Sequence, residues 1–324
     1  MDIKRCAIGI DLGGSKIALG TVDEAGRLLE LLRFDTEVRG GYSAVLNQVV
    51  TGVEQLKGAY GVSMSGIGIG VAGQVDPATG AVVCAPNLDW HNMPLQAEVQ
   101  KACAIPVVVT NDVRAALWGE WLFGAGVSAA DLVCIFIGTG IGGGIVSGGR
   151  VLEGCSNTAG EIGHMTVDVR GPLCHCGNRG CMEALAGGWA IARRAHESVK
   201  ADPVLGSTIL KMAGGKVEDI SAKTVVRAFY AGDVLAVEII DEVTDALAAG
   251  AAALVNALNP CQIILGGGII EGMPEMVSRI DNGVRRRALS AATGRLAIRA
   301  SKLGNEAGII GAAALAMRTF STIA

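Results

Sequence analysis

Stretches of continuous or alternating apolar residues give way along this chain to stretches with helical spacing, a pattern typical of an α/β protein. The run Arg5–Ile10 predicts a first strand, which is followed by a glycine-rich turn, a second strand at Ile17–Val22 and a third strand that reaches Leu32. No helix fits between these strands, so the three form a hairpin meander. Residues Ser43–Tyr60 then carry apolar side chains three and four positions apart, which predicts a helix.

Strands and helices alternate through the middle of the chain. The expected elements are a strand at Gly66–Val71, a loop rich in turn residues through Trp90, a helix at Leu95–Ala102, a strand at Ile105–Val109 and a helix from Asn111 to Phe123. The opening theme then returns, because strand Asp131–Ile137 enters the glycine run Gly138–Gly144 and continues as strand Ile145–Ser147. Two copies of strand, glycine hairpin and strand indicate a duplicated fold with a cleft between its halves.

The remainder of the chain is mainly helical. The expected helices are Glu183–Val199, Ser221–Tyr230, Ala236–Leu258, one that contains Arg285–Arg287, and Glu306–Arg318. Among them, strand Gln262–Leu265 ends in a third glycine group, Gly266–Gly268.

Composition and charge narrow the functional classes. The 324 residues have a net charge of −4, so the chain lacks the excess of positive charge that is typical of proteins that bind nucleic acid. Hydrophobic residues make up 50% of the chain but never gather into a membrane span or a secretory signal. We therefore expect a cytoplasmic protein with neither a membrane nor a nucleic-acid partner. Six of the nine cysteines stand singly in apolar stretches and are expected to be small core residues in a reducing compartment. They are Cys6, Cys84, Cys103, Cys134, Cys155 and Cys261.

The glycine runs are candidates for phosphate binding. Gly138, Gly140 and Gly143 match G-x-G-x-x-G after a strand, and Glu161 lies near the place of a ribose-binding acid, as in dinucleotide-binding folds. Such folds need a helix directly after the glycines, whereas a short strand follows here. We therefore interpret both glycine turns as cradles of backbone N–H groups for nucleotide phosphates; one turn alone would indicate only a tight hairpin. Asp11, at the mouth of the first turn, either approaches phosphate-bound magnesium or simply forms the turn.

The other three cysteines form a candidate zinc site. His164, Cys174, Cys176 and Cys181 lie within a short loop-like segment, and Zn²⁺ favours four such ligands in a tetrahedron. His164 is preferred to His175, which stands between two ligands. With four protein ligands the zinc would be structural.

Three carboxylates accompany these motifs. Glu161 and Glu183 flank the zinc loop, where they suit recognition of sugar hydroxyls, although Glu183 also suits the first turn of a helix. Asp112 lies at the carboxyl end of a buried strand. It is either the N-cap of the next helix or the base of a phosphoryl transfer.

Together these residues resemble the ROK family, which comprises bacterial glucokinases, related sugar kinases and sugar-responsive repressors. The resemblance covers nearly the whole chain, and its most specific part is E-x-G-H at Glu161–His164 combined with C-x-C-G-x-x-G-C-x-E at Cys174–Glu183. Further matching segments are Ile10–Lys16, Asn111–Ala116 and Gly138–Gly144. The chain departs from common relatives at His175, where Gly is frequent, and at Trp189, which could alter the pocket wall or a subunit contact.

The resemblance implies an actin/hexokinase-like (ribonuclease H-like) α/β fold, duplicated into two lobes with ATP and sugar in a central cleft. The small lobe would take residues 1–111 and be rejoined by a C-terminal helix at 305–324, and the large lobe would take 112–304. With ATP and Mg²⁺, Asp112 would activate a primary sugar hydroxyl, normally O6. The implied sugar-binding residues are Asn111, Glu161, His164, Glu183 and, more loosely, Gly73 and Asn87. The implied nucleotide-binding residues are Asp11, Gly13, Gly14, Ser15, Lys16, Gly138, Thr139, Gly140, Gly142, Gly266, Gly267 and Gly268. Relatives are often dimers or tetramers, so a homo-oligomer is expected.

Two alternatives to a glucokinase stay open at this level. Kinases of N-acetylmannosamine share every motif above, and nothing in the sequence identifies the group at C2 of the sugar. A sugar-responsive repressor would carry a DNA-binding helix-turn-helix ahead of the first glycine turn, whereas the first strand begins near Arg5.

Overall fold

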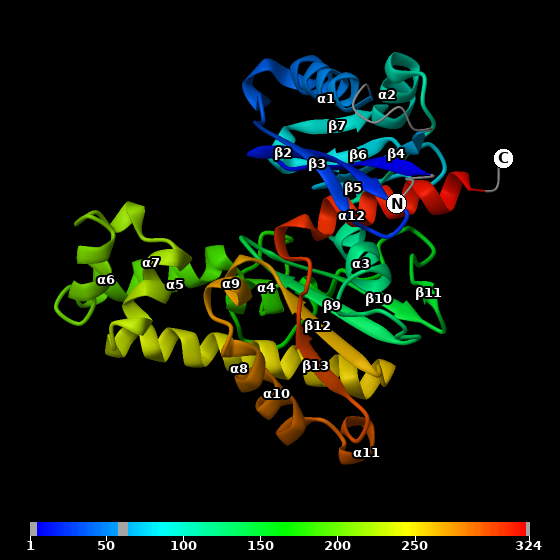
Figure 1. The fold of residues 1–324 in the computed structure, drawn as a ribbon. Helices are drawn as coiled ribbons and strands as arrows, with labels where there is room; N and C mark the ends of the chain where they lie inside the picture. Colours follow the sequence, from blue (N-terminus) through cyan, green and yellow to red (C-terminus); the bar gives the residue numbers. More distant parts are fainter. Residues whose placement is uncertain (1–4, 58–63, 322–324) are drawn as a thin grey trace. The chain divides into compact units, whose positions relative to one another are not determined.

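The structure, a computed structural model, describes residues 5–57 and 64–321 (Figure 1). These residues divide into two compact units. The first comprises the chain up to Ser128, the segment Glu153–Ala159 and the chain from Lys302 onward, and the second comprises Ala129–Leu152 and Gly160–Ser301. Each unit has its own hydrophobic core.

A five-stranded sheet forms the centre of the first unit. Its strands are β1 (Cys6–Leu12), β2 (Lys16–Asp23), β3 (Leu28–Asp35), β4 (Met64–Val71) and β8 (Val107–Asn111), in the order β3-β2-β1-β4-β8. The expected meander is confirmed, since β2 is antiparallel to both β1 and β3. Strands β4 and β8 extend the sheet in parallel with β1.

Helices cover both faces of this sheet. Strand side chains alternate between the faces, so Ile8 and Ile10 pack with α1 (Gly41–Lys57) and α2 (Leu95–Cys103), whereas Ala7 packs with α12 (Ala307–Phe320). Helix α3 (Asp112–Leu122) lies beside α12 (Figure 1). The helix expected over Ser43–Tyr60 is thus confirmed as far as Lys57, and its last three residues lie outside the described part of the chain.

The loop expected before Trp90 is wrong in part. This region folds into a second, three-stranded sheet of β5 (Gln74–Val75), β6 (Val82–Ala85) and β7 (Trp90–Met93). Strands of two to four residues are too short to show a period in the sequence. Their pairing depends on turns such as the one at Asp76, whose side chain accepts hydrogen bonds from the N–H groups of Ala78 and Thr79.

The sheet of the second unit repeats the topology of the first. Its strands are β9 (Leu132–Ile137), β10 (Ile141–Ser147), β11 (Arg150–Val151), β12 (Gln262–Gly266) and β13 (Ala297–Ala300), in the order β11-β10-β9-β12-β13. Again three strands form an antiparallel meander, and two more continue in parallel with the first. The duplicated fold is confirmed. The expected second glycine turn is shorter than thought, because Gly142–Gly144 pair within β10.

Most of the second unit's helices lie against one another and against this sheet (Figure 1). They are α4 (Met182–Ala186), α5 (Gly188–Ala201), α6 (Ser207–Met212), α7 (Ala222–Tyr230), α8 (Val234–Leu258), α9 (Gly268–Gly272), α10 (Met276–Arg287) and α11 (Ser290–Thr293). The single helix expected over Glu183–Val199 is two helices, because Gly187 adopts an extended conformation between them. Within the described residues, no helix combines the length and the apolar composition that a membrane crossing needs.

The burial of the six single cysteines and the boundary of the first unit both differ in part from expectation. Cys6, Cys103 and Cys134 are buried as expected, but Cys84, in the short strand β6, is half-buried and Cys155 and Cys261 are exposed. Apolar neighbours in sequence therefore do not guarantee a core position. The first unit continues through α3 to Ser128, beyond the division at residue 111 that the sequence suggested. Helix α3 packs on α12 and β4, which explains its place in this unit.

Candidate active site and the Cys/His cluster

Asn111 caps the helix that carries Asp112. Its side-chain oxygen accepts hydrogen bonds from the N–H groups of Val113 at 3.0 Å and Arg114 at 3.2 Å, and its amide nitrogen donates to the carbonyl of Gly73 at 3.2 Å. The N-cap role considered for Asp112 therefore belongs to Asn111. Asp112 is the first residue of α3, and its carboxylate accepts the N–H of Val113 at 2.9 Å.

Asp11 and Asp112 lie close enough to influence each other. Asp11 pairs in the sheet with Gly70, where an added Cβ would come within 3.2 Å of the Asp112 Cα. Because Gly70 has no side chain, α3 can begin directly over the ends of β1 and β4. Burial, and next the Asp112 carboxylate, raise the pKa of Asp11 to about 7.

The first glycine turn is held by its own backbone and by Thr36. The N–H of Gly13 donates to the carbonyl of Lys16 at 3.0 Å, and the Thr36 hydroxyl donates to the carbonyl of Gly13 at 2.8 Å. Gly14 faces Asn87 so closely that a Cβ on Gly14 would lie 2.7 Å from the Asn87 Cβ. Ser15 and Lys16 are exposed. The structure thus brings Asn87 to the turn and Gly73 to Asn111.

A polar contact between Arg114 and Asn157 in the first unit was not predicted from the sequence. The buried Arg114 guanidinium donates to the side-chain oxygen of Asn157 and, at 3.0 Å, to its carbonyl, and the Asn157 amide donates to the carbonyl of Val75 at 3.0 Å. Asn157 also has a left-handed backbone, with φ of 59°. This contact fixes the segment Glu153–Ala159 in the first unit although its flanks belong to the second.

The second unit contains a pocket of about 460 Å³. Its lining residues are Gly138, Thr139, Gly188, Trp189, Ala192, Ile220, Ser221, Ala222, Lys223, Gly268 and Ile269. Two predicted glycine groups, Gly138–Gly140 and Gly266–Gly268, therefore contribute to one pocket with a largely apolar wall. The residues from Ile220 to Lys223 were not predicted as binding residues. They are far from the glycine turn in sequence, and no sequence pattern indicates that the fold brings them to it.

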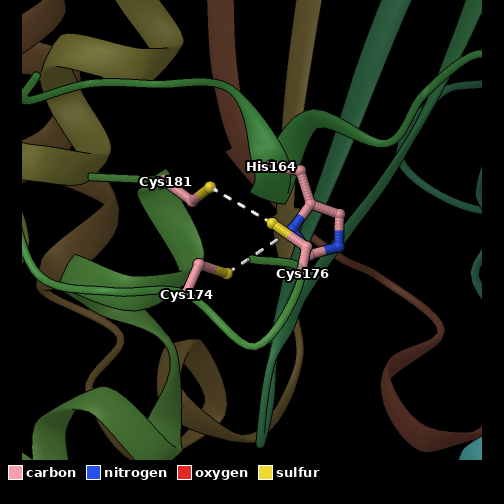
Figure 2. A group of neighbouring side chains, drawn as sticks. All are labelled: His164, Cys174, Cys176 and Cys181. Atoms are coloured by element: carbon pink, nitrogen blue, oxygen red, sulfur yellow. Dashed lines mark hydrogen bonds between the residues drawn. The ribbon is translucent and has the colours of Figure 1, made fainter. Parts of the chain in front are cut away.

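The four predicted zinc ligands come together in the second unit (Figure 2). Their ligand atoms all lie within 4.8 Å of one another. The Cys174 Sγ is 3.7 Å from the His164 Nδ1, and the Cys176 Sγ is 3.7 Å from the Cys181 Sγ. The 3-10 turn Ile162–His164 supplies the histidine, and the loop before α4 supplies the thiols.

These distances suit a single zinc ion. Two sulfurs bound tetrahedrally at about 2.3 Å from one metal lie about 3.8 Å apart. Burial, and next the neighbouring thiols of Cys176 and Cys174, raise the pKa of the Cys181 thiol to about 12. A bound dication would offset the cost of holding thiolates in this place.

The two carboxylates beside the cluster differ in their surroundings. Glu161, just before the 3-10 turn, is exposed. Glu183, in the first turn of α4, is half-buried, and its Oε2 accepts the N–H of Ile141 at 2.9 Å. Its Oε1 accepts the indole N–H of Trp189 at 3.4 Å. Glu183 therefore links the cluster loop to the glycine turn of the pocket.

Comparison with known proteins identifies the family of the chain. The model of the ROK family matches residues 7–319. The chain belongs to the ROK family.

Two ROK glucokinases are similar to this chain over nearly its whole length. A glucokinase from Streptomyces coelicolor is 36% identical over 310 residues, which cover 95% of this chain and 96% of the relative. The crystal structure of a ROK glucokinase from Streptomyces griseus, in complex with glucose and AMPPNP, matches with a TM-score of 0.84 and 36% identity, covering 97% of this chain and 99% of that one. The actin/hexokinase-like fold is thereby confirmed.

A xylose repressor from Caldicellulosiruptor bescii is also similar. It is 32% identical over 250 residues, which cover 77% of this ROK chain but only 62% of the repressor. The similarity to this ROK regulator is thus less extensive than the similarity to the glucokinase.

Proposed function

We propose that this ROK protein is a glucokinase that transfers the γ-phosphoryl group of ATP to the 6-hydroxyl of glucose. The assignment of an ATP-dependent sugar kinase is carried by the match along nearly all of both chains to a ROK glucokinase crystallised with glucose and AMPPNP. Glucose as the acceptor is the finer part of the proposal. It is supported by the 36% identity to the Streptomyces coelicolor glucokinase and by the glucose bound in the Streptomyces griseus structure.

Asp112 is the proposed general base. Its carboxylate would accept the proton of the attacking hydroxyl, while the oxygen forms a bond to the γ-phosphorus and the bond to the β–γ bridging oxygen breaks, which releases ADP. Because Asn111 caps α3, Asp112 is not needed as the cap. The helix N-terminus also favours the ionised carboxylate that a base requires.

The proposed sugar ligands are the residues that the family resemblance implies. Asn111, with Gly73 and Asn87 more loosely, belongs to the first unit, and Glu161, His164 and Glu183 belong to the second. Their carboxylate and amide oxygens can accept hydrogen bonds from sugar hydroxyls. His164 would serve zinc through Nδ1, which faces Cys174, and leave its other ring nitrogen for the sugar.

The 460 Å³ pocket is the proposed site of the nucleotide base. Its apolar wall suits a planar ring, and the N–H groups of the Gly138–Gly140 turn and of Gly266–Gly268 suit the phosphates that follow. In the first unit, Gly13, Gly14, Ser15 and Lys16 are proposed to contact phosphate. Asp11 is proposed to hold Mg²⁺, which would neutralise charge on the phosphate oxygens.

The test of this function is ADP release measured with glucose, mannose, fructose, N-acetylglucosamine and N-acetylmannosamine. We expect the highest kcat/KM with glucose, and a loss of about 10³-fold in kcat for Asp112→Asn with little change in nucleotide affinity. A higher kcat/KM with N-acetylmannosamine would show that the protein is a hexosamine kinase. If none of the five sugars supports ADP release, the kinase assignment is rejected. Near-normal kcat in Asp112→Asn would reject the base.

Zinc in the Cys/His cluster is proposed to hold Glu161 and Glu183 in place. We expect about one zinc ion per chain by elemental analysis, and loss of zinc together with a lower unfolding temperature for Cys176→Ser. Cys155→Ser, which changes an exposed cysteine away from the cluster, is the matched control and should keep the metal. A metal-free preparation of full thermal stability would contradict the proposal. Assembly into dimers or tetramers stays a prediction.

A further inference from the structure

Trp189 contacts both the cluster loop and Glu183, and it lines the pocket of the second unit. Its backbone N–H donates to the carbonyl of Thr139 at 3.0 Å, which places it at the first turn of α5 against the glycine turn. Its side chain packs against Cys174, Cys181 and Ala184. The same residue lines the 460 Å³ pocket.

The indole ring is held by an aromatic stack. The His175 and Trp189 ring centroids are 4.1 Å apart, with 26° between the planes. The guanidinium carbon of Arg193 lies 5.9 Å from the centroid of the Trp189 ring, within the range of a cation–π contact. His175 lies between two predicted metal ligands in the sequence but does not belong to the cluster of four, and its ring stacks on Trp189 instead.

The edge of this held ring reaches Glu183. The indole N–H donates to Glu183 Oε1 at 3.4 Å, while Oε2 accepts the N–H of Ile141 at 2.9 Å. The backbone bond at Oε2 alone leaves the carboxylate able to rotate about its last torsion, whose energy profile is broad. The second bond, at Oε1, selects one orientation.

We propose that Trp189 is a positioning residue that orients the Glu183 carboxylate, and that its stacking on His175 couples this orientation to the Cys/His loop. The inference rests on the proposed function in one respect, namely that Glu183 binds the sugar. Trp189 does not itself need to touch the sugar. Its action runs through Glu183, so it affects sugar affinity more than the chemical step.

The experiment compares variants that remove one contact at a time. Trp189→Phe keeps an aromatic ring for the stack and the pocket wall but loses the indole N–H. We expect the KM for glucose to rise about fivefold, in keeping with the net contribution of one ordinary hydrogen bond, since this bond is long at 3.4 Å. The values of kcat and of the KM for ATP should stay within about twofold. Trp121→Phe, the same change in the first unit, is the matched control and should leave all three constants unchanged.

Two histidine variants test the stack. His175→Ala should raise the KM for glucose in the same direction, and His175→Tyr, which restores an aromatic ring, should return it to within about twofold of the wild-type value. Zinc content should be equal in all three proteins. Loss of zinc in His175→Ala would assign the residue to the metal site and overturn the stacking role.

Tryptophan emission gives a readout independent of turnover. Subtracting the Trp189→Phe spectrum from that of the wild type isolates Trp189, and we expect this component to shift in both Glu183→Gln and His175→Ala. The proposal is overturned if neither variant moves it, or if Trp189→Phe lowers kcat and raises both KM values together, as general damage to the fold would. If Glu183→Gln shifts the emission yet leaves the KM for glucose unchanged, Trp189 still orients Glu183, but the assignment of Glu183 as a sugar ligand is wrong.

Discussion

Neighbouring side chains determine the surroundings of two carboxylates of the first unit, Asp11 and Asp112. Asn111 takes over the capping of α3, and this leaves Asp112 one residue further on with a helical backbone. Asp11 experiences both burial and the neighbouring Asp112 carboxylate, which raise its pKa to about 7. At neutral pH the protein without magnesium therefore holds a mixture of protonated and ionised Asp11.

This shift makes stability depend on pH. Because the pKa of Asp11 is raised in the folded state from an ordinary value of 3.8 to about 7, its contribution to stability is full below pH 4 and is lost as the pH rises through 7. Asp11→Asn has no such charge to bury. We expect its unfolding temperature, measured in magnesium-free buffer, to rise relative to wild type by about 2–4 °C between pH 5 and pH 8. The exposed Asp35→Asn should show no such trend, and an equally flat difference for Asp11→Asn would contradict the shift.

At the scale of elements, glycines allow α12 to pack directly on the backbone of the first sheet. A Cβ on Gly68 of β4 would lie 1.8 Å from the carbonyl oxygen of Ala312, and one on Gly9 of β1 would lie 1.9 Å from that of Ile309. Helix α3 approaches α12 equally closely, because a Cβ on Gly311 of α12 would lie 1.7 Å from the carbonyl oxygen of Ala115 in α3. The N-terminal turn of α12 consequently lies beside Asp11, since a Cβ on Gly308 would come within 3.1 Å of its carboxylate.

We expect Gly68→Ala to lower the unfolding temperature by about 5–10 °C, because an atom placed against backbone forces α12 away from the sheet. The measurement is thermal unfolding followed by circular dichroism. Gly272→Ala is the matched control, since a Cβ there meets nothing within 4 Å. Equal stability of the two variants would show that the packing of α12 adjusts freely.

At the scale of the whole molecule, the chain leaves the first unit and returns to it twice, and buried polar groups fasten each return. Arg114 and Asn157 hold the segment Glu153–Ala159. The fully buried Glu120 holds the second return, because its carboxylate oxygens accept the N–H groups of Lys302 at 3.0 Å and Leu303 at 2.7 Å. It also accepts the N–H of Ala125 at 2.8 Å.

Glu120→Gln should destabilise the protein by about 2–3 kcal/mol, because both carboxylate oxygens accept N–H groups and glutamine would turn its own NH₂ toward one of them. Urea unfolding followed by tryptophan fluorescence measures this loss. The exposed Glu24→Gln serves as the control with no expected change. A neutral Glu120→Gln would mean that the return at Lys302 is held by other contacts.

The sequence by itself determined the features whose physics is local. Apolar periods identified the two meanders and most of the long helices, and the density of His164, Cys174, Cys176 and Cys181 identified a cluster that the structure brings within 4.8 Å. Residues so close in the chain need only a loop to meet. Their chemistry is therefore readable without the fold.

Only the tertiary structure decided what depends on distant neighbours. The contact between Arg114 and Asn157 joins segments far apart in sequence, and the exposure of Cys155 and Cys261 depends on how the surrounding segments pack. Trp189 is the clearest case. From the sequence it was a departure from relatives that could alter the pocket wall or a subunit contact. The structure places it in the pocket wall, with its ring on His175 and its N–H on Glu183. The physical reason is that the periodicity of a sequence shows which side of an element faces the core. It does not show which side chains of other elements that side contacts.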